Sequence, residues 1–440
     1  MLTIRRVATV VSNYQEDGTS EKVIRGEAKG CGRNCLGRCC LPASRLPLYA
    51  FKKDGGLPVV ETITCAEHPP MSFLLSMLLG QWEDRKDRGL FRYDVTTCET
   101  KIIPGKYGFI AQLNEGRLLK KRPTEFRVDQ VLQPFDENKF NFTKVGQDEV
   151  LFAFEQSYDL HSRYFPSVPV TSVSSSPNVV AINVSPIEYG HVLLIPRILD
   201  HLPQRIDHES LLLALRLAEE VADPFFRVGY NSLGAFATIN HLHFQAYYSA
   251  ATFPAEKAPT EPIVITRTPG GLQERGITVS KLLGYPVRSL ELEGGDSMQE
   301  LCNVVVSSCI CLQNNNIPFN LLISDCGKRV FLFPQCYAEK QAFGEVSPEL
   351  LNTQVNPAVW EISGHMVLKR WVDYDNASEA YAWRLLVEVS LSEQRFQEVK
   401  DYILEALGVQ EEMGLKYDEA ISESPATETR YILHDCPVEQ

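Results

Sequence analysis

The chain has 440 residues, of which 44% are hydrophobic and 22% are charged, a composition typical of globular rather than disordered proteins. Its length exceeds the roughly 100–200 residues of a typical domain, so two or three structural units are expected. The formal net charge of −13 excludes a general nucleic-acid binder, because neutralising phosphates requires a clustered positive surface.

The N-terminal residues 1–15, MLTIRRVATVVSNYQ, lack the apolar core and the cleavage site of a secretory signal. No apolar run approaches the roughly 20 residues of a membrane span, so we expect a cytoplasmic protein. The twelve cysteines are then expected to be reduced. Four of them lie close together without the Cys-x-x-Cys spacing of common zinc sites: Cys31, Cys35, Cys39 and Cys40. Clustered thiols are therefore favoured over a metal clip, and no metal or cofactor is predicted.

The first predicted elements follow an irregular arm, residues 1–60, which is rich in Gly, Cys and basic residues. Apolar residues recur at helical spacing over 70–90 and predict a helix. Strand-like runs broken by Gly and Pro follow at 107–112 and 126–132.

A hairpin and a helix are predicted next. Two apolar runs, 178–184 and 191–195, flank a turn and indicate paired strands. Residues 210–221 have the amphipathic pattern of a helix, with Asp207 or Ser210 as its N-cap.

The second half begins with a Pro-, Gly- and Thr-rich segment, 252–280, which is predicted to be a linker or long loop. A helix over 297–313, a hairpin of 319–324 with 330–333 and a helical region over 377–408 follow. Hairpins and helices thus recur in both halves, which hints at a duplicated unit, although no strong sequence repeat supports it.

The segment 239–248, INHLHFQAYY, carries the chemistry. In an extended strand, His241, His243 and Gln245 share one face, and the apolar residues between them share the other. Three interpretations are open: a half-exposed strand with a polar outer face, a metal site, and nucleophilic catalysis at phosphorus. Two histidines fall short of the three or four ligands of zinc sites. A neutral imidazole attacks phosphorus well near pH 7, because its ordinary pKa is about 6.5.

The surrounding sequence resembles the histidine-triad superfamily. The run 183–197, with Pro, Gly-His and an apolar stretch ending in Pro-Arg, is similar to the hairpin before the catalytic strand of that superfamily. Gln245 stands where the hydrolases have a third histidine, which resembles the transferase branch typified by galactose-1-phosphate uridylyltransferase. The resemblance implies that His243 is the covalent nucleophile and that Gln245 holds the phosphoryl oxygens. His241 would have a supporting role, through a hydrogen bond near His243 or to the backbone, and the alternative is that it has no direct function. Because an amide is neither acid nor base, the intermediate would wait for phosphate rather than water.

The same resemblance implies further site residues. Asn231 and Gly234 are similar to the phosphate-contacting stretch, and Asn240 is a candidate phosphate contact. His191 occupies the position of the first family histidine, where it would orient His243 by a hydrogen bond. An ordinary structural role is the alternative for Asn240 and His191.

Basic residues gather at 119–127. Within this run, Lys121 and Arg122 are candidate contacts to substrate phosphates, since Arg offers bidentate hydrogen bonds. A solvated surface strip is one alternative, and a nuclear-localisation signal is another.

Further runs, over roughly residues 1–408, resemble the GDP-L-galactose phosphorylases of plants; they begin at Cys31, Gly80, Pro104, Leu119 and Asn356. The resemblance implies conversion of GDP-L-galactose and inorganic phosphate to L-galactose 1-phosphate and GDP through a guanylyl-histidine, in ascorbate biosynthesis. The alternatives are GDP-D-glucose or another GDP-hexose as substrate, a metal-dependent hydrolase, and a nucleotide-binding regulatory protein. Relatives of this kind imply a homodimer.

The expected architecture is α+β, with two histidine-triad-like units that each consist of an antiparallel sheet and packed helices. The catalytic unit is expected over 61–251 and a second, non-catalytic unit over 281–408. The arm 1–60, the loop 252–280 and a polar tail, 409–440, complete the chain.

Overall fold

The structure is a computed structural model that describes residues 34–52, 71–120, 126–159, 161–172, 174–266, 276–295 and 297–408. Cys31, Lys121, Arg122 and the predicted tail lie outside the described residues. Within these ranges, no helix combines the length and the apolar character needed to cross a membrane.

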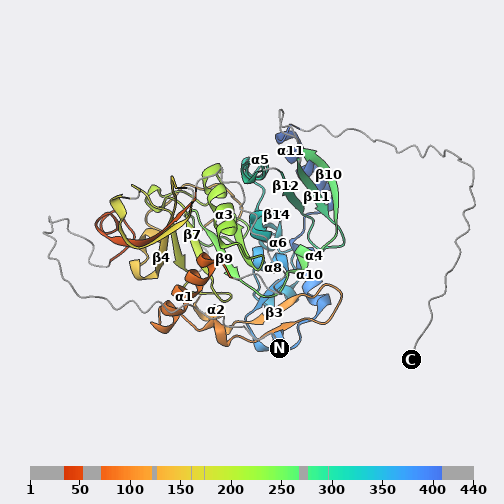
Figure 1. The fold of residues 1–440 in the computed structure, drawn as a ribbon. Coiled ribbons are helices and arrows are strands. Elements are labelled where there is room, and N and C mark those ends of the chain that lie inside the picture. Colours follow the sequence, from red (N-terminus) through yellow and green to blue (C-terminus); the bar gives the residue numbers. More distant parts are fainter. Residues whose placement is uncertain are drawn as a thin grey trace, which may run out of the picture. The chain divides into compact units, whose positions relative to one another are not determined.

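A sheet of 12 strands forms the centre of the fold (Figure 1). Neighbouring strands pair antiparallel except β1 and β4, which are parallel. In spatial order the strands are β10 (Thr260–Thr266), β11 (Ile277–Leu282), β12 (Leu290–Gly294), β14 (Arg329–Pro334), β13 (Phe319–Ser324), β8 (Phe226–Asn231), β9 (Phe244–Tyr248), β7 (Val192–Ile195), β6 (Val179–Ile182), β4 (Val150–Gln156), β1 (Arg45–Phe51) and β5 (Arg163–Pro169). The α+β class is thereby confirmed.

Both edges of this sheet carry prolines, which lack the N–H needed for another ladder. Pro262 lies in β10, and Pro166 and Pro169 lie in β5. Edge prolines oppose pairing with a further strand and so limit edge-to-edge aggregation.

Four long helices share one apolar core with the central strands. They are α1 (Phe73–Asp87), α3 (His208–Val221), α5 (Met298–Asn314) and α11 (Glu393–Ala406). All four begin at an N-cap side chain that accepts a hydrogen bond from the backbone N–H three residues on: Ser72, Asp207, Ser297 and Ser392. Asp207 is thus the cap of α3. Phe244 and Ala246 of β9 point into this core.

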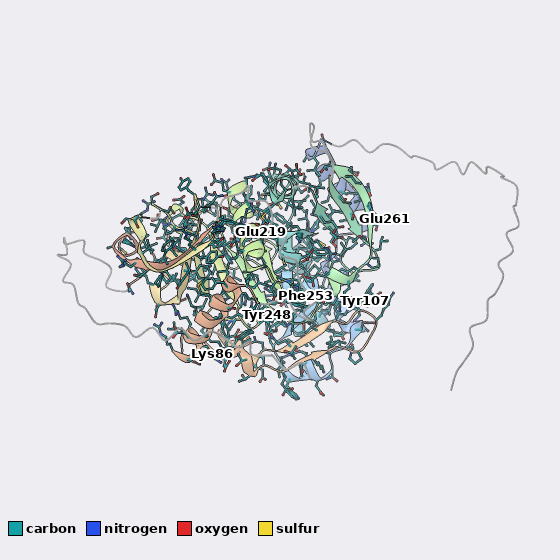
Figure 2. All side chains as sticks on the ribbon, viewed as in Figure 1. Lys86, Tyr107, Glu219, Tyr248, Phe253 and Glu261 are labelled. Carbon is teal, nitrogen blue, oxygen red and sulfur yellow. The ribbon has the colours of Figure 1, made fainter. Side chains whose placement is uncertain are left out.

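A second sheet, β15 (His365–Leu368), β3 (Ile110–Leu113) and β2 (Thr100–Ile102), belongs to another core. Tyr247, on the opposite face of β9 from Phe244, lies in this core and packs against Trp360, with ring centroids 4.1 Å apart and ring planes inclined by 41°. Phe253, labelled in Figure 2, packs against both rings. The remaining helices are α2 (Glu115–Lys120), α4 (Pro254–Lys257), α6 (Tyr337–Ala342), α7 (Pro348–Asn352), α8 (Val359–Ser363), α9 (Trp371–Asp375) and α10 (Glu379–Val389).

The sheet runs unbroken through both halves of the chain, because β8 pairs with β13. Asn231 of β8 lies opposite Asn320 of β13, and the Asn320 amide donates to Asn231 Oδ1 at 2.6 Å. The separate sheets expected for two units are therefore joined side by side into one.

Several predicted elements are confirmed: the helices at 70–90, 210–221 and 297–313, and the hairpins β6–β7 and β13–β14. Others are wrong. The region 126–132 forms no regular strand, and 377–408 holds two helices, because the chain breaks at Ser390 after α10.

The predicted loop 252–280 contains α4, β10 and the start of β11, and the arm predicted as irregular contains β1. Pro and Gly mark edges and turns here, not the absence of strands.

Candidate active site

His243 lies just before β9, buried at the margin of a cavity. Its Nδ1 is 2.8 Å from the carbonyl oxygen of His241. Because a carbonyl can only accept, Nδ1 carries the proton and the lone pair of the neutral ring lies on Nε2. Burial lowers the pKa of His243 to about 4 and outweighs the hydrogen bond to His241, which raises it. The imidazole is therefore neutral near pH 7, with Nε2 available as a nucleophile.

The backbone of His243 is held by Gln204, a buried side chain of the loop before α3. Gln204 Oε1 accepts from His243 N at 2.9 Å, and its Nε2 donates to the carbonyls of His243 and Asn231 at 3.1 and 2.9 Å. The backbone of Gln204 is fixed in turn by Asn240 Oδ1 and by the Tyr230 hydroxyl. A buried amide whose oxygen and nitrogen are both engaged keeps one orientation, so Gln204 positions the nucleophile.

The cavity beside His243 has a volume of about 340 Å³. The ring of Phe142 packs against the His243 ring with centroids 4.9 Å apart and planes inclined by 64°. Apolar side chains supply part of the lining: Leu90, Phe140, Phe142, Val145, Leu193, Ile195 and Ile239. Polar and basic side chains supply the rest, among them Arg92, Arg117, Lys144, Asn183, Thr238 and Gln245. Aromatic and basic side chains together suit a ligand with a planar base and phosphates.

Gln245 lies between this cavity and a smaller one of about 40 Å³, because it lines both. The indole N–H of Trp360 approaches Gln245 Oε1 at 3.4 Å. The Gln245 side chain also hydrogen-bonds His191, and an amide nitrogen can donate to a bound group. The alternation expected along this segment is confirmed, since Leu242, Phe244 and Ala246 face the helical core. Regular strand begins only at Phe244, so the predicted strand over 239–248 is too long.

Arg117, on α2, is the cation where the two cavities meet. Its Nη1 donates to the carbonyl of Ser185 at 3.1 Å. The smaller cavity adds Lys369, whose pKa is lowered chiefly by burial. The sequence interpretation chose Lys121 and Arg122 and missed Arg117. A single arginine on a six-residue helix belongs to no sequence motif. The one feature that could have indicated it is its position close to the basic run at 119–127.

The ring of His241 does not line either cavity. It is fully buried, and its Nδ1 accepts a hydrogen bond from Phe142 N at 3.1 Å. Burial lowers its pKa to about 3, with the charge of His243 as the next cause. His241 therefore contacts the His243 ring through its carbonyl oxygen.

His191 and Asn240 also take structural positions. His191 Nδ1 accepts from Ile187 N at 2.8 Å, and its fully buried ring packs near Tyr247. The hydrogen bond expected from His191 to His243 is made instead by the His241 carbonyl. The Asn240 amide donates to the carbonyls of Gln133 and Pro134 and accepts from Gln204 N, so it ties loops together outside the two cavities.

Asn231 and Gly234 differ in their positions. Asn231 lines the smaller cavity, and its Oδ1 accepts from Asn320 Nδ2 and from Val359 N at 2.6 and 3.0 Å. Its amide nitrogen is thus presented as a donor. Gly234 lines neither cavity; its φ of +77° and the Val128 carbonyl, 3.0 Å from where a Cβ would lie, require glycine there.

A buried neutral histidine, an amide and cations lie around one cavity, an arrangement suited to nucleotidyl transfer. Two family models match the chain, one described as "GDPGP1-like, N-terminal domain" over residues 73–247 and one described as "GDPGP1-like, C-terminal domain" over residues 254–410. The chain belongs to this GDPGP1-like family.

Among named proteins, the chain is 66% identical over 411 residues to GDP-L-galactose phosphorylase 1 of Arabidopsis thaliana, which covers 93% of this chain and 90% of that protein. It is 33% identical over 357 residues to GDP-D-glucose phosphorylase 1 of Homo sapiens, covering 78% and 86% of the two chains. The crystal structure of yeast Ap4A phosphorylase Apa2 in complex with Ap4A is similar with a TM-score of 0.47 and 14% identity, covering 73% of this chain and 98% of that chain.

Proposed function

We propose that the chain is a GDP-L-galactose phosphorylase that converts GDP-L-galactose and inorganic phosphate to L-galactose 1-phosphate and GDP through a guanylyl group held on His243. The substrate is supported by 66% identity to a protein named GDP-L-galactose phosphorylase 1. The covalent route is supported by one observation above all: the His241 carbonyl fixes the proton of His243 on Nδ1.

In the first half-reaction, His243 Nε2 attacks the α-phosphorus, a P–N bond forms, and the bond from that phosphorus to the bridging oxygen breaks. L-galactose 1-phosphate leaves with the electron pair of that bond. The ring becomes positively charged as it bonds to phosphorus, and the His241 carbonyl, 2.8 Å from Nδ1, stabilises that charge. The Gln245 amide nitrogen and Arg117 stabilise the negative charge on the phosphoryl oxygens.

In the second half-reaction, an oxygen of inorganic phosphate attacks the same phosphorus and the P–N bond breaks. GDP is released, and His243 returns to its neutral form with the proton still on Nδ1. Gln245 has no proton to give or take near pH 7, so it can orient the guanylyl group without activating water.

The decisive experiment is intact-protein mass spectrometry after brief mixing with GDP-L-galactose in phosphate-free buffer. We expect wild type to gain the mass of one guanylyl group and to lose it, with release of GDP, when phosphate is added. His243→Ala should form no adduct and should lose turnover, because no other histidine is among the described residues that line the two cavities.

The matched control is His161→Ala, which removes an exposed histidine that lines neither cavity. It should form the adduct as wild type does. Full turnover by His243→Ala would sink the covalent route through this residue, and so would an adduct that phosphate does not discharge.

GDP-D-glucose is the second candidate substrate, because relatives named GDP-D-glucose phosphorylase 1 are also similar to this chain, the human one at 33% identity. The same assay with each sugar nucleotide separates them. We expect kcat/KM for GDP-L-galactose to be the larger, and the reverse order would reassign the substrate while leaving the role of His243 unchanged.

The cytoplasm remains our proposed compartment, and a homodimer our proposed assembly.

A further inference from the structure

Three cysteines of the short segment before β1 bring their thiols close together. The Sγ atoms of Cys35, Cys39 and Cys40 all lie within 4.8 Å of one another, and those of Cys35 and Cys39 are 3.4 Å apart. Among the residues that the structure describes, this is the one group of three or more Cys, His, Asp or Glu side chains so arranged. We propose that these three cysteines bind a zinc ion.

The distances suit a tetrahedral thiolate site. Zinc binds cysteine sulfur at about 2.3 Å, so ligands at the tetrahedral angle lie about 3.8 Å from each other. The Cys35–Cys39 separation of 3.4 Å is slightly shorter than this value, and no pair of the three sulfurs is more than 4.8 Å apart, so binding one ion requires only small side-chain rotations. Binding displaces three thiol protons and leaves a fourth coordination position for water or another ligand. Cys35 is buried and Cys39 is exposed, so the ion has an open route to the site.

The backbone around the thiols is arranged as it is around metal-bound sulfur. The N–H of Gly37 approaches Cys35 Sγ at 3.4 Å, and hydrogen bonds of this kind stabilise thiolate ligands. The Gly37 carbonyl accepts from Cys40 N and Leu41 N at 3.0 and 2.9 Å, which turns the chain back on itself. A Cβ at Gly37 would lie 3.4 Å from Cys35 Sγ and 3.7 Å from Cys39 Sγ, which is ordinary van der Waals contact, so the backbone at Gly37 lies directly beside both sulfurs.

The cysteine loop is joined to the chain segment that lines the larger cavity. Leu36 N donates to the Val145 carbonyl at 3.0 Å, and Gln147 Nε2 donates to the Cys35 carbonyl at 3.0 Å. Val145 and Phe142 of that segment line the cavity, and Phe142 packs on the His243 ring. A metal that stiffens the cysteine loop thus holds the cavity wall in place without touching the substrate.

The test begins with the metal content of the full chain. The protein is produced with zinc in the medium, passed through metal-free buffer and measured by plasma mass spectrometry. We expect about one zinc per wild-type chain, and its loss in Cys39→Ser and in Cys40→Ser. Cys326→Ser, which removes a half-buried thiol elsewhere, should keep the zinc.

Cobalt substitution tests the ligands independently of folding yield. Co²⁺ added to metal-free wild type should give the sulfur-to-cobalt charge-transfer bands and the strong visible bands of a tetrahedral thiolate site, and both should weaken in the Cys39→Ser chain. Zinc retained by both serine variants would overturn the proposal. A wild type that takes up neither metal would also overturn it, as would a Cys35–Cys39 disulfide in chain isolated under reducing conditions.

Discussion

Burial of His243 has a direct kinetic consequence. The pKa of His243 in the folded chain is about 4. The ring therefore stays neutral, with Nε2 available as a nucleophile, at pH values well below the ordinary histidine pKa of 6.5. We therefore expect kcat/KM for GDP-L-galactose to stay nearly flat from pH 7 to pH 5.5. An unperturbed histidine would lose about tenfold over that interval. In a two-step route this constant reports only the first half-reaction, so the ionisation of phosphate does not enter. An acid limb centred between pH 6 and 7 would show that the ring is not buried as described.

Gln204 is expected to contribute both to stability and to the rate of adduct formation. Replacement by Ala leaves His243 N and the carbonyls of His243 and Asn231 without their buried partner. We expect a loss of about 2–4 kcal/mol in the free energy of unfolding. We also expect slower adduct formation with little change in the binding of GDP-L-galactose. Denaturant unfolding and single-turnover mass spectrometry measure the two effects. A variant that is less stable yet forms the adduct at the wild-type rate would reduce Gln204 to a purely structural residue.

The sequence predicts those site residues that belong to a recognisable local pattern. His243 and Gln245 stand two apart in an apolar segment, so alternation placed them together. Gln204 and Arg117 are isolated polar residues in a loop and a short helix, 39 and 126 positions before His243, and reach the site only through tertiary contacts. His241 follows the same alternation, but its contact with the His243 ring is made by its carbonyl oxygen and not by its imidazole.

Among the elements, the short helix α8 brings the second half of the chain to the nucleophile. Val359 and Trp360 press against β8, where a Cβ on Gly229 would come within 2.7 Å of Val359 and 3.0 Å of Trp360. Val359 N donates to Asn231 Oδ1, and the Trp360 indole donates to Gln245. Two polar groups of the site are therefore oriented from α8.

Trp360→Phe tests the orienting contact. Phenylalanine keeps an aromatic ring against Tyr247 but has no N–H for Gln245 Oε1. We expect adduct formation to slow by roughly fivefold, the equivalent of one hydrogen bond of about 1 kcal/mol, with little change in thermal stability. Trp360→Ala, which also removes the ring, should lose both rate and stability. Equal rates in Trp360→Phe and wild type would mean that the Gln245 amide is held by other contacts.

At the level of elements, the sequence predicted the helices and hairpins with regular apolar spacing. It missed strands in segments that are rich in Pro and Gly. The helices with apolar periodicity and the hairpins around tight turns were predicted because local spacing determines them. The edge strand β10 was not, since Pro262 and the Thr- and Pro-rich flanks read as a loop. An edge strand tolerates proline on its unpaired side, which a pattern alone does not show.

Across the whole molecule, one sheet joins two matched family domains through the β8–β13 pair. No local pattern could predict this pairing, because strand partners are chosen by non-local packing and register. The consequence is that the catalytic half has no free edge at β8. The next strand, β9, which begins directly after His243, is paired on both sides, with β8 and with β7.

Burial of histidines also sets the response of the whole fold to acid. The pKa is lowered to about 3 in two of them and about 4 in a third, and it lies well below 6.5 in the fourth: His241, His365, His243 and His191. Desolvation is the largest cause in each. The unfolded chain binds protons at these positions below pH 6.5 while the folded chain does not. The stability that depends on them is complete above pH 6.5 and is lost as the pH falls towards their folded values.

Glu155 and Glu188 act in the opposite direction, because burial raises the pKa of each to about 7. Between pH 4.5 and 7 the folded chain holds about two protons that the unfolded chain has lost, which leaves a net uptake of about two protons when the chain unfolds near pH 5.5. This net uptake grows from about 0.5 proton at pH 6.5 to about two protons at pH 5.5, so the free energy of unfolding should fall by about 2 kcal/mol over this interval, as measured by urea titration. His365→Asn, which cannot take up a proton, should make this slope shallower by about one proton. A stability that does not change over this interval would mean that the buried carboxyl groups and the buried imidazoles cancel, and that acid sensitivity arises elsewhere in the chain.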